Sequence, residues 1–410
     1  MGLELNEERF VSTMKEQAEI GATDGGGLHR LALSDDDKRI RDWFLEQIEN
    51  AGLDVRIDEF GNTFGRREGE ESGEPVLVGS HLDSQPYGGI YDGALGVIAA
   101  LELIRELNDR DITTTRPIEI VNWTNEEGSR FQPAMQGSGV WAGAHDIETE
   151  YAKTDTDGNT LESELERIGY KGDHSAEPAA DYDSYLELHV EQGPYLEEND
   201  KSVGIVTGIV GFKWGAITYH GEADHSGPTP MHHRSDALVP AADVITQIRR
   251  LPGTLGERTV GTVGYVDVQP NSINIIPEEV TFTWGVRDPT SEVLEEAYEH
   301  VLAEAEAAAE REGVEWEHED RMNVDPVYFA DRCVDAVEDA TVDLGYDAMR
   351  IFSGAGHDAT HADSVCDTAM VFAVSENGKS HNESEYTSWE DCYKAANTLA
   401  SAAFDLAQEK

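Results

Sequence analysis

Five side chains that can bind metal ions lie at or near the predicted ends of strands: His81, Asp92, Glu127, His189 and His381. Histidine nitrogens and carboxylate oxygens are ligands from which proteins build sites for zinc and related divalent ions. A carboxylate between two histidine-bearing half-sites can bridge two ions, and Asp92, in the Gly-rich segment GGIYDG, suits that place. The pattern therefore suggests a two-metal hydrolytic centre that leaves a position open for water.

Two adjacent carboxylates, Glu126 and Glu127, follow the apolar segment 118–123. Neighbouring carboxylates repel each other unless a cation or a proton separates them. On an extended segment their side chains point to opposite sides, so the two can take different roles. We expect one of them to be a metal ligand and the other a general base.

Short apolar segments and amphipathic helices alternate along the first half of the chain. Segments 75–79, 118–123 and 185–188 predict buried strands, and segment 94–108, apolar nearly all round, predicts a buried helix. This alternation favours an α/β sheet with helices on its faces. In such sheets ligands bind beyond the carboxyl ends of the strands, which is where the five side chains fall.

Two further segments have contrasting patterns. Ser34 and Asp37 form a capping box, which predicts a helix that ends at the turn 50–52. Segment 146–183 is acidic and poorly periodic, so we expect it to lie on the surface.

The middle of the chain predicts a second domain. Residues 212–325 follow the order strand, helix, strand, strand, helix, strand, with strictly alternating apolar residues in segment 280–286. A region of this size can form a domain of its own. We therefore expect an inserted α+β domain at 212–325, with residues 1–211 and 326–410 forming one α/β domain.

The composition excludes several classes of partner. The sequence has 83 Asp and Glu against 30 Lys and Arg, a formal net charge of −53, and the acidic residues are dispersed. Nucleic acids and anionic membranes require a basic face, so neither is an expected partner. The excess instead indicates a cytoplasm rich in salt, where screening weakens self-repulsion.

The cysteines and the apolar segments indicate a location. Cys333, Cys366 and Cys392 are odd in number and match no CxxC pattern, as is typical of a reducing compartment without disulfides. The acidic N-terminal segment resembles no secretory signal, and no apolar run approaches the length of a membrane span. We expect a soluble, cytoplasmic protein.

Seven motifs, in order along the chain, resemble those of the M20 metallopeptidase-like amidohydrolases and, among these, the hydantoinase/carbamoylase branch. The motifs are GSHLDS (79–84), YDG (91–93), NWTNEEGSRF (122–131), ELHVEQGP (187–194), ADHSGPTPM (223–231), NIIP (274–277) and SHNE (380–383). The resemblance implies a mixed-sheet catalytic domain of the di-metal aminopeptidase type. It also implies that the inserted α+β domain is a lid that carries a homodimer interface.

The resemblance also implies residue roles. His81, Asp92 and His189 would hold one divalent ion and Asp92, Glu127 and His381 the other, with zinc, manganese or cobalt as the metal. Glu126 would be the general base that takes a proton from the attacking water and returns it to the leaving nitrogen. The residues implied to contact substrate are His225, Asn274 and Arg287 in the lid, and Gln192, Gly356 and His357 in the catalytic domain. Arg287 suits a substrate carboxylate and His225 a developing oxyanion.

The implied activity is cleavage of the carbamoyl C–N bond of an N-carbamoyl amino acid, giving amino acid, ammonia and carbon dioxide. Its substrate would be a small molecule with a carboxylate and a ureido group, either β-ureidopropionate or an N-carbamoyl-L-amino acid. Allantoate or another ureido acid is the alternative within this class. A dipeptidase or aminoacylase is less favoured because of His189 and the EQGP motif, and a non-catalytic binding relative because Glu126 is retained. The roles of Asp358 and His361, and the subunit whose site the lid residues serve, stay open.

The charge balance generates a first prediction. Removing screening ions should destabilise the folded protein, since the Debye length grows from roughly 3 Å at 1 M salt to roughly 30 Å at 0.01 M. We expect the melting temperature and the activity to rise with KCl into the molar range, as followed by thermal denaturation. A melting temperature that stays constant between about 0.1 M and about 3 M KCl would refute adaptation to salt.

Overall fold

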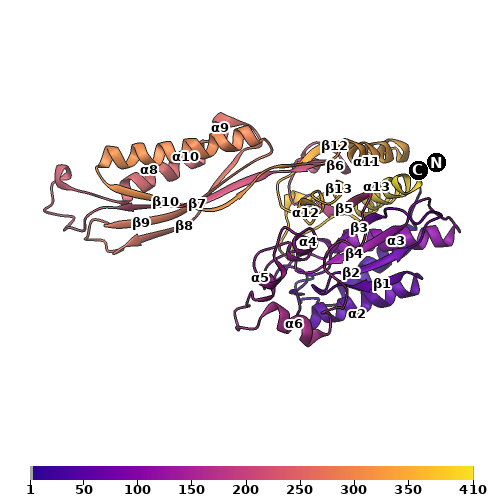
Figure 1. Cartoon of the computed structure of the whole chain (residues 1–410). Helices are drawn as coiled ribbons and strands as arrows, with labels where there is room; N and C mark the ends of the chain where they lie inside the picture. Colours follow the sequence, from indigo (N-terminus) through magenta and orange to yellow (C-terminus); the bar gives the residue numbers. More distant parts are fainter. Residues whose placement is uncertain (1–2, 410) are drawn as a thin grey trace. The chain divides into compact units, whose positions relative to one another are not determined.

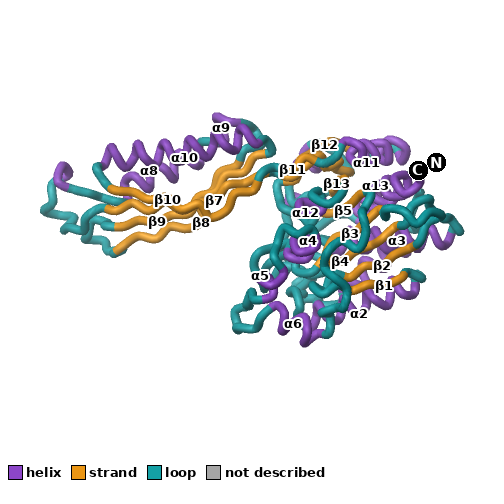
Figure 2. The backbone as a smooth tube through the Cα atoms, in the orientation of Figure 1, coloured by secondary structure: helices purple, strands orange, loops and turns teal. Residues whose placement is uncertain are grey.

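The computed structural model describes residues 3–409 and divides into two compact units (Figures 1 and 2). The first unit contains the described residues up to Thr207 and from Tyr328 onward, and the second is Gly208–Val327. The sequence placed the corresponding limits at 212 and 325. Each unit has its own sheet, so the α/β class and the separate α+β domain predicted from the sequence are confirmed.

The first unit is built on a nine-stranded mixed sheet with the strand order β1-β2-β4-β3-β5-β13-β6-β11, in which β12 also pairs with β6. Strands β4, β3, β5 and β13 are mutually parallel, while β1, β2 and β6 add antiparallel pairs. The strands are β1 (Asp54–Ile57), β2 (Thr63–Arg67), β3 (Val76–His81), β4 (Ile118–Trp123), β5 (Ser184–Val190), β6 (Val203–Ile209), β11 (Val327–Tyr328), β12 (Ala348–Ser353) and β13 (Asp367–Ala373).

Helices pack on this sheet and connect its strands. They are α1 (Glu7–Ala18), α2 (Asp35–Asn50), α3 (Ala94–Asp109), α4 (Gln136–Trp141), α5 (Ile147–Tyr151), α6 (Leu161–Ile168), α7 (Tyr195–Glu198), α11 (Asp331–Leu344), α12 (Ala359–Ala362) and α13 (Trp389–Gln408). Helices α3 and α13 contact each other and strands β3 and β5. Every residue of β3, β4 and β5 is buried, as expected for strands with cover on both faces. The Ser34 side chain caps α2 by accepting from Asp37 N, which confirms the predicted N-cap, while the Asp37 side chain accepts from Leu33 N instead of closing the box on Ser34 N.

The acidic segment 146–183 is not simply a surface segment, so that prediction was wrong. It contains α5 and α6, and it contributes Leu161, Leu165 and Ile168 to a buried cluster with Phe60. These three residues have helical spacing, but α6 is only eight residues long and acidic residues separate them. A helix this short carries too few turns for its period to stand out against such a background.

The second unit is a four-stranded antiparallel sheet. Helices lie along one face of it, as Figure 2 shows. The strand order is β10-β7-β9-β8. The elements are β7 (Gly211–His220), α8 (Leu238–Arg250), α9 (Pro252–Leu255), β8 (Val260–Gln269), β9 (Glu279–Asp288), α10 (Ser291–Glu312) and β10 (Glu315–Val324). The alternating apolar side chains of β9 pack against α8 and α10 and form the core of this unit. The predicted alternation in segment 280–286 is therefore confirmed.

One buried ion pair links α2 to the chain that leads to the predicted site. Arg41 Nε donates to Asp37 Oδ2 at 2.7 Å, and these side chains are 1% and 0% exposed. The same guanidinium donates to Gly61 O at 2.8 Å and to Thr124 Oγ1 at 3.3 Å. Thr124 directly follows β4 and lies two residues before Glu126, so this pair supports the segment that carries the two glutamates.

Removing Arg41 generates the second prediction. Arg41→Met should lower the free energy of unfolding by about 3–5 kcal/mol, because it leaves the buried Asp37 carboxylate without its cation. Arg39→Ala on the same helix is the matched control. It removes an ion pair with Asp36 whose side chains are 59% and 39% exposed, and it should cost at most about 1 kcal/mol. Urea denaturation of the three proteins measures both changes, and equal losses would contradict the analysis.

Within the described residues, no helix combines the length and the apolar character needed to cross a bilayer.

Candidate metal centre

The predicted ligands come together because neighbouring parallel strands end at one edge of the sheet. Strand β3 lies between β4 and β5 and is parallel to both. His81 is the last residue of β3, His189 is the last but one of β5, and Glu126 and Glu127 follow β4. The carboxyl ends of parallel strands form the place where such sheets bind ligands.

One cluster is formed by His81, Asp92 and His189, whose ligand atoms all lie within 4.8 Å of one another. Asp92 Oδ1 lies 2.9 Å from His189 Nε2 and 3.4 Å from His81 Nε2. All three residues are buried. Gly93 makes this approach possible, because its φ is +62° and a Cβ atom there would clash with the His81 ring.

A second cluster is formed by Asp92, Glu127 and His381, again with all ligand atoms within 4.8 Å. His381 Nε2 lies 3.6 Å from Asp92 Oδ2 and 3.6 Å from Glu127 Oε2. Asp92 thus turns one oxygen to each cluster, in the bridging position that the sequence suggested for it. The His381 side chain is 50% exposed, so this cluster is open to solvent.

Glu126 lies beside the first cluster, with Oε2 at 3.5 Å from His81 Nε2. Asp83 fixes the backbone of the two adjacent glutamates, because its carboxylate accepts from Glu126 N at 3.2 Å and from Glu127 N at 3.3 Å. Each glutamate faces a different part of the centre, Glu126 toward His81 and Glu127 toward His381. This separation agrees with the expectation of two different roles.

Burial and mutual charge shift the acidities of these groups. Burial raises the pKa of Glu126 well above its usual value, although His81 opposes this. Burial and the Asp92 charge raise the pKa of Glu127 to about 8. Burial alone would raise the pKa of Asp92, but His189 and His81 hold it well below its usual value. Burial alone would lower the pKa of His189, but Asp92 raises it to about 9.

These groups fit divalent metal ions. His81 Nε2 is a buried nitrogen without a hydrogen-bond partner among the described residues, and it faces Asp92 and Glu126. Unpaired polar atoms in such positions are costly unless a ligand or an ion satisfies them. Burial is the main cause of the raised pKa values of Glu126 and Glu127, and a bound cation would offset the cost of ionising these two carboxylates. Imidazole nitrogens and carboxylate oxygens that lie within 4.8 Å of one another can act together as ligands of zinc, manganese or cobalt.

Three residues predicted to contact substrate lie around the clusters in the first unit. Gln192 Nε2 donates to Asp92 Oδ2 at 2.9 Å. The His357 ring is buried and lies 4.4 Å from the His189 ring, centroid to centroid. Gly356 precedes it, and a Cβ at Gly356 would meet the Met135 side chain. The structure therefore brings all three to the edge that carries the ligands.

The other three predicted substrate residues belong to the second unit. His225 and Asn274 lie on neighbouring exposed loops. His225 forms an isolated β-bridge with Ile275, and Ser226 Oγ donates to Asn274 Oδ1 at 2.9 Å. Arg287 lies on β9, with its guanidinium carbon 5.4 Å from the centroid of the Phe212 ring. Within this unit the two loops are thus brought together, while Arg287 occupies a strand of the sheet.

Several residues that support the centre were not assigned from the sequence. Glu385 is 5% exposed, and its Oε1 accepts from Asp92 N at 3.2 Å while its Oε2 accepts from Ser380 Oγ at 2.7 Å. Asp358 Oδ1 accepts from Ser138 Oγ at 2.5 Å. Hydrogen bonds between loops leave no periodic pattern in a sequence, so they could not be predicted for Asp83. Its spacing from His81 was the only sequence signal for this residue.

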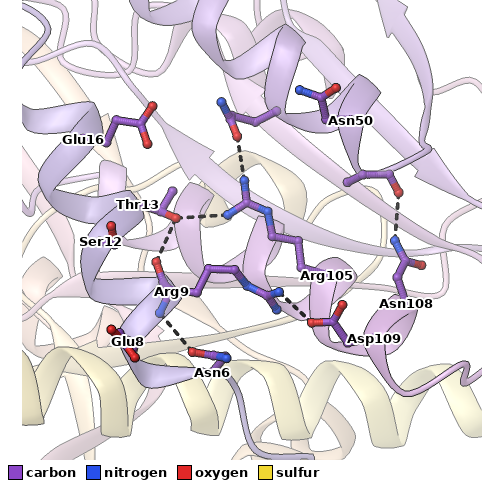
Figure 3. Close-up of a pocket in the computed structure, with 12 residues that line it drawn as sticks. Asn6, Glu8, Arg9, Ser12, Thr13, Glu16, Asn50, Arg105, Asn108 and Asp109 are labelled. Atoms are coloured by element: carbon purple, nitrogen blue, oxygen red, sulfur yellow. Dashed lines mark hydrogen bonds and ion pairs between the residues drawn. The ribbon is translucent and has the colours of Figure 1, made fainter.

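An open cavity of about 710 Å³ lies between α1, α2 and α3 and contains none of the predicted site residues (Figure 3). Its polar side chains pair with one another: Arg9 Nη1 lies 2.6 Å from Asp109 Oδ2, and Arg105 donates to Thr13 and Gln47. This cavity is not the candidate site, because chemistry favours the metal centre, where buried titratable groups converge.

Comparison with known proteins shows the family of the chain. Residues 77–405 match peptidase family M20/M25/M40. The chain is 40% identical to an N-carbamoyl-L-amino-acid amidohydrolase of Rhizobium meliloti over 98% of this chain and 97% of that protein. It is 31% identical to an allantoate amidohydrolase of Bacillus subtilis over 95% of each chain. A crystal structure of an amidase of the hydantoinase/carbamoylase family from Burkholderia multivorans superposes with a TM-score of 0.94 at 43% identity, covering 99% of both chains.

Proposed function

Because the chain belongs to peptidase family M20/M25/M40 and, within it, to the hydantoinase/carbamoylase branch, we propose that it hydrolyses N-carbamoyl-L-amino acids. Water would cleave the carbamoyl C–N bond and give one amino acid, one ammonia and one carbon dioxide. The observation that carries this proposal is a carboxylate, Asp92, shared by two histidine-bearing clusters, with a further carboxylate, Glu126, beside them.

The residues of the centre would divide the work. His81, Asp92 and His189 would hold one divalent ion, and Asp92, Glu127 and His381 a second one. Such ions act as Lewis acids and lower the pKa of water, and zinc, manganese and cobalt all suit these donors. Glu126 would take the proton from the attacking water and deliver it to the leaving nitrogen. Its place beside His81, outside both ligand sets, supports this role.

The surrounding polar residues would bind and orient the substrate. Arg287 would pair with the carboxylate of the amino acid through its planar fork, and His225 would donate to the developing oxyanion. The remaining substrate contacts would come from Asn274, Gln192, Gly356 and His357. The pairing of the His225 and Asn274 loops supports a shared role for these two residues.

Two alternatives stay within the same chemistry. The 31% identity to an allantoate amidohydrolase supports a ureido acid such as allantoate, and β-ureidopropionate has the same reacting group. The higher identity to N-carbamoyl-L-amino-acid amidohydrolases favours the α-amino acid.

We also propose a homodimer that pairs through the second unit. Strand β8 is an edge of its sheet and exposes Val260, Tyr265 and Val266 at 50%, 54% and 45%. Exposed apolar edges favour pairing with another strand, and twofold dimers are the commonest oligomers.

The formal charge of −53 further supports a cytoplasmic, salt-adapted protein.

A substrate panel tests the proposed activity as the third prediction. The kcat/KM for ammonia release should be highest for N-carbamoyl-L-amino acids. It should be at least about tenfold lower for β-ureidopropionate (N-carbamoyl-β-alanine), since one misplaced methylene costs about 1–3 kcal/mol. Allantoate should also be slower. A preference for allantoate would move the assignment to the alternative, and inactivity toward every ureido acid would refute the proposal.

The fourth prediction separates the two adjacent glutamates. Glu126→Gln preserves the shape of the side chain but removes its basicity, so it should keep its metal and lose about 10²–10⁴-fold in kcat. Glu127→Gln should instead lose metal from one half-site, and added metal should partly restore its activity. Bound metal per subunit and kcat are measured for both variants. Loss of metal from Glu126→Gln alone would mean that the roles are reversed.

A further inference from the structure

The two halves of the metal centre differ in how their ligands are held. His81 Nδ1 lies 3.0 Å from Asp83 O, and His189 Nδ1 lies 2.9 Å from Val190 O. A main-chain carbonyl accepts only from a protonated nitrogen, so each ring carries its proton on Nδ1 and directs a fixed Nε2 toward Asp92. The backbone itself therefore orients the histidines of this half.

The other half has a less constrained histidine. The His381 side chain is 50% exposed, and its φ of 54° lies in the left-handed region that residues other than glycine rarely adopt. Its geometry depends on the exposed turn that carries it. This half must therefore rely more strongly on the fixed placement of Glu127.

Gln85 holds both oxygens of the Glu127 carboxylate. The backbone N–H of Gln85 donates to Oε1 at 2.9 Å, and its side-chain Nε2 donates to Oε2 at 2.8 Å. The same Nε2 donates to the main-chain oxygen of Glu127 at 3.2 Å. Because the amide bonds both the carboxylate and the main chain of one residue, it fixes the direction of that side chain.

We call these three hydrogen bonds from Gln85 to Glu127 the Gln85 clamp. The position of Gln85 in the chain makes the clamp a link between two strand ends. Gln85 lies four residues after His81, the last residue of β3, while Glu127 lies four residues after Trp123, the last residue of β4. The clamp thus ties the loop that follows one ligand to the side chain of another. Hydrogen bonds that orient metal ligands in this way are worth about 10–100-fold in metal affinity.

We infer that Gln85 is a positioning residue for the half-site of Asp92, Glu127 and His381. It sets the affinity of that half for its ion and leaves the half of His81 and His189 unaffected. The inference deepens the proposed function and rests on it, since it takes both halves to bind an ion. The affinity for one ion would therefore depend on the side-chain amide of Gln85, and the affinity for the other ion would not.

Gln85→Leu tests this inference, because leucine keeps the approximate size of the side chain and removes its donor. The purified protein is stripped with a chelator and titrated with Zn²⁺ or Mn²⁺, and bound metal per subunit is measured by equilibrium dialysis. We expect one ion to bind as in the unmodified protein and the second to bind about 10–100-fold more weakly.

Tyr87→Ala is the matched control, because Tyr87 lies on the same loop, is 58% exposed, and contacts the His29 ring instead of the carboxylate. It should bind both ions unchanged. Equal affinity for the second ion in Gln85→Leu, or equal weakening of both ions, would overturn the inference. Gln85→Met replaces the leucine variant if that one does not fold, and failure of both to fold would show that Gln85 serves the fold instead.

The substrate panel separates this inference from the proposed function. Selective loss of one ion in a protein that hydrolyses no ureido acid would support the role of Gln85 and refute the activity. Hydrolysis of N-carbamoyl amino acids with metal binding insensitive to Gln85 would do the reverse.

Discussion

The buried carboxylate of Asp92 is the constraint on which the rest of the catalytic unit depends. One oxygen faces two imidazoles and the other faces His381, while Glu385 accepts from its backbone N–H. A buried anion is costly unless it is paired and hydrogen-bonded. The parallel strands bring His81 and His189 to one oxygen of this side chain, and the loops that carry Gln192 and Ser380 bring donors to the other oxygen. The architecture can therefore be understood as the set of elements that keeps Asp92 ionised.

A second buried carboxylate, Asp83, allows the two glutamates after β4 to face different parts of the centre. Asp83 holds their two amides, so the backbone between them is fixed. Glu126 then faces the half whose histidines are oriented by carbonyls, and Glu127 faces the open half with His381. In the proposed function, a rigid half beside a more open one would let metal ligands and a proton-transfer group be close neighbours without competing for one position.

The sequence predicted those parts of the molecule that leave a periodic or positional signal. Segment 118–123 became β4 with unchanged limits, Ser34 capped α2, and ligand-type residues at strand ends met at one edge. Residues that act through hydrogen bonds between loops, such as Asp83 and Glu385, could not be assigned, because their partners are set by the tertiary fold alone. The core of α6 was missed for a related reason, since two turns in an acidic segment carry little pattern.

The second unit enters and leaves the catalytic sheet at neighbouring strands. It begins at the end of β6 and ends at β11, which pair with each other at one side of the nine-stranded sheet, and Phe329 N donates to Thr207 O at 3.1 Å. The two connection points are therefore one hydrogen bond apart. An insertion with adjacent ends puts little strain on its host, and domain insertion succeeds where ends lie close together at a surface. The nine-stranded sheet can thus act as a host whose inserted unit evolution or a protein engineer could shorten or replace. The ends of β3, β4 and β5, where the candidate ligands lie, would keep their positions.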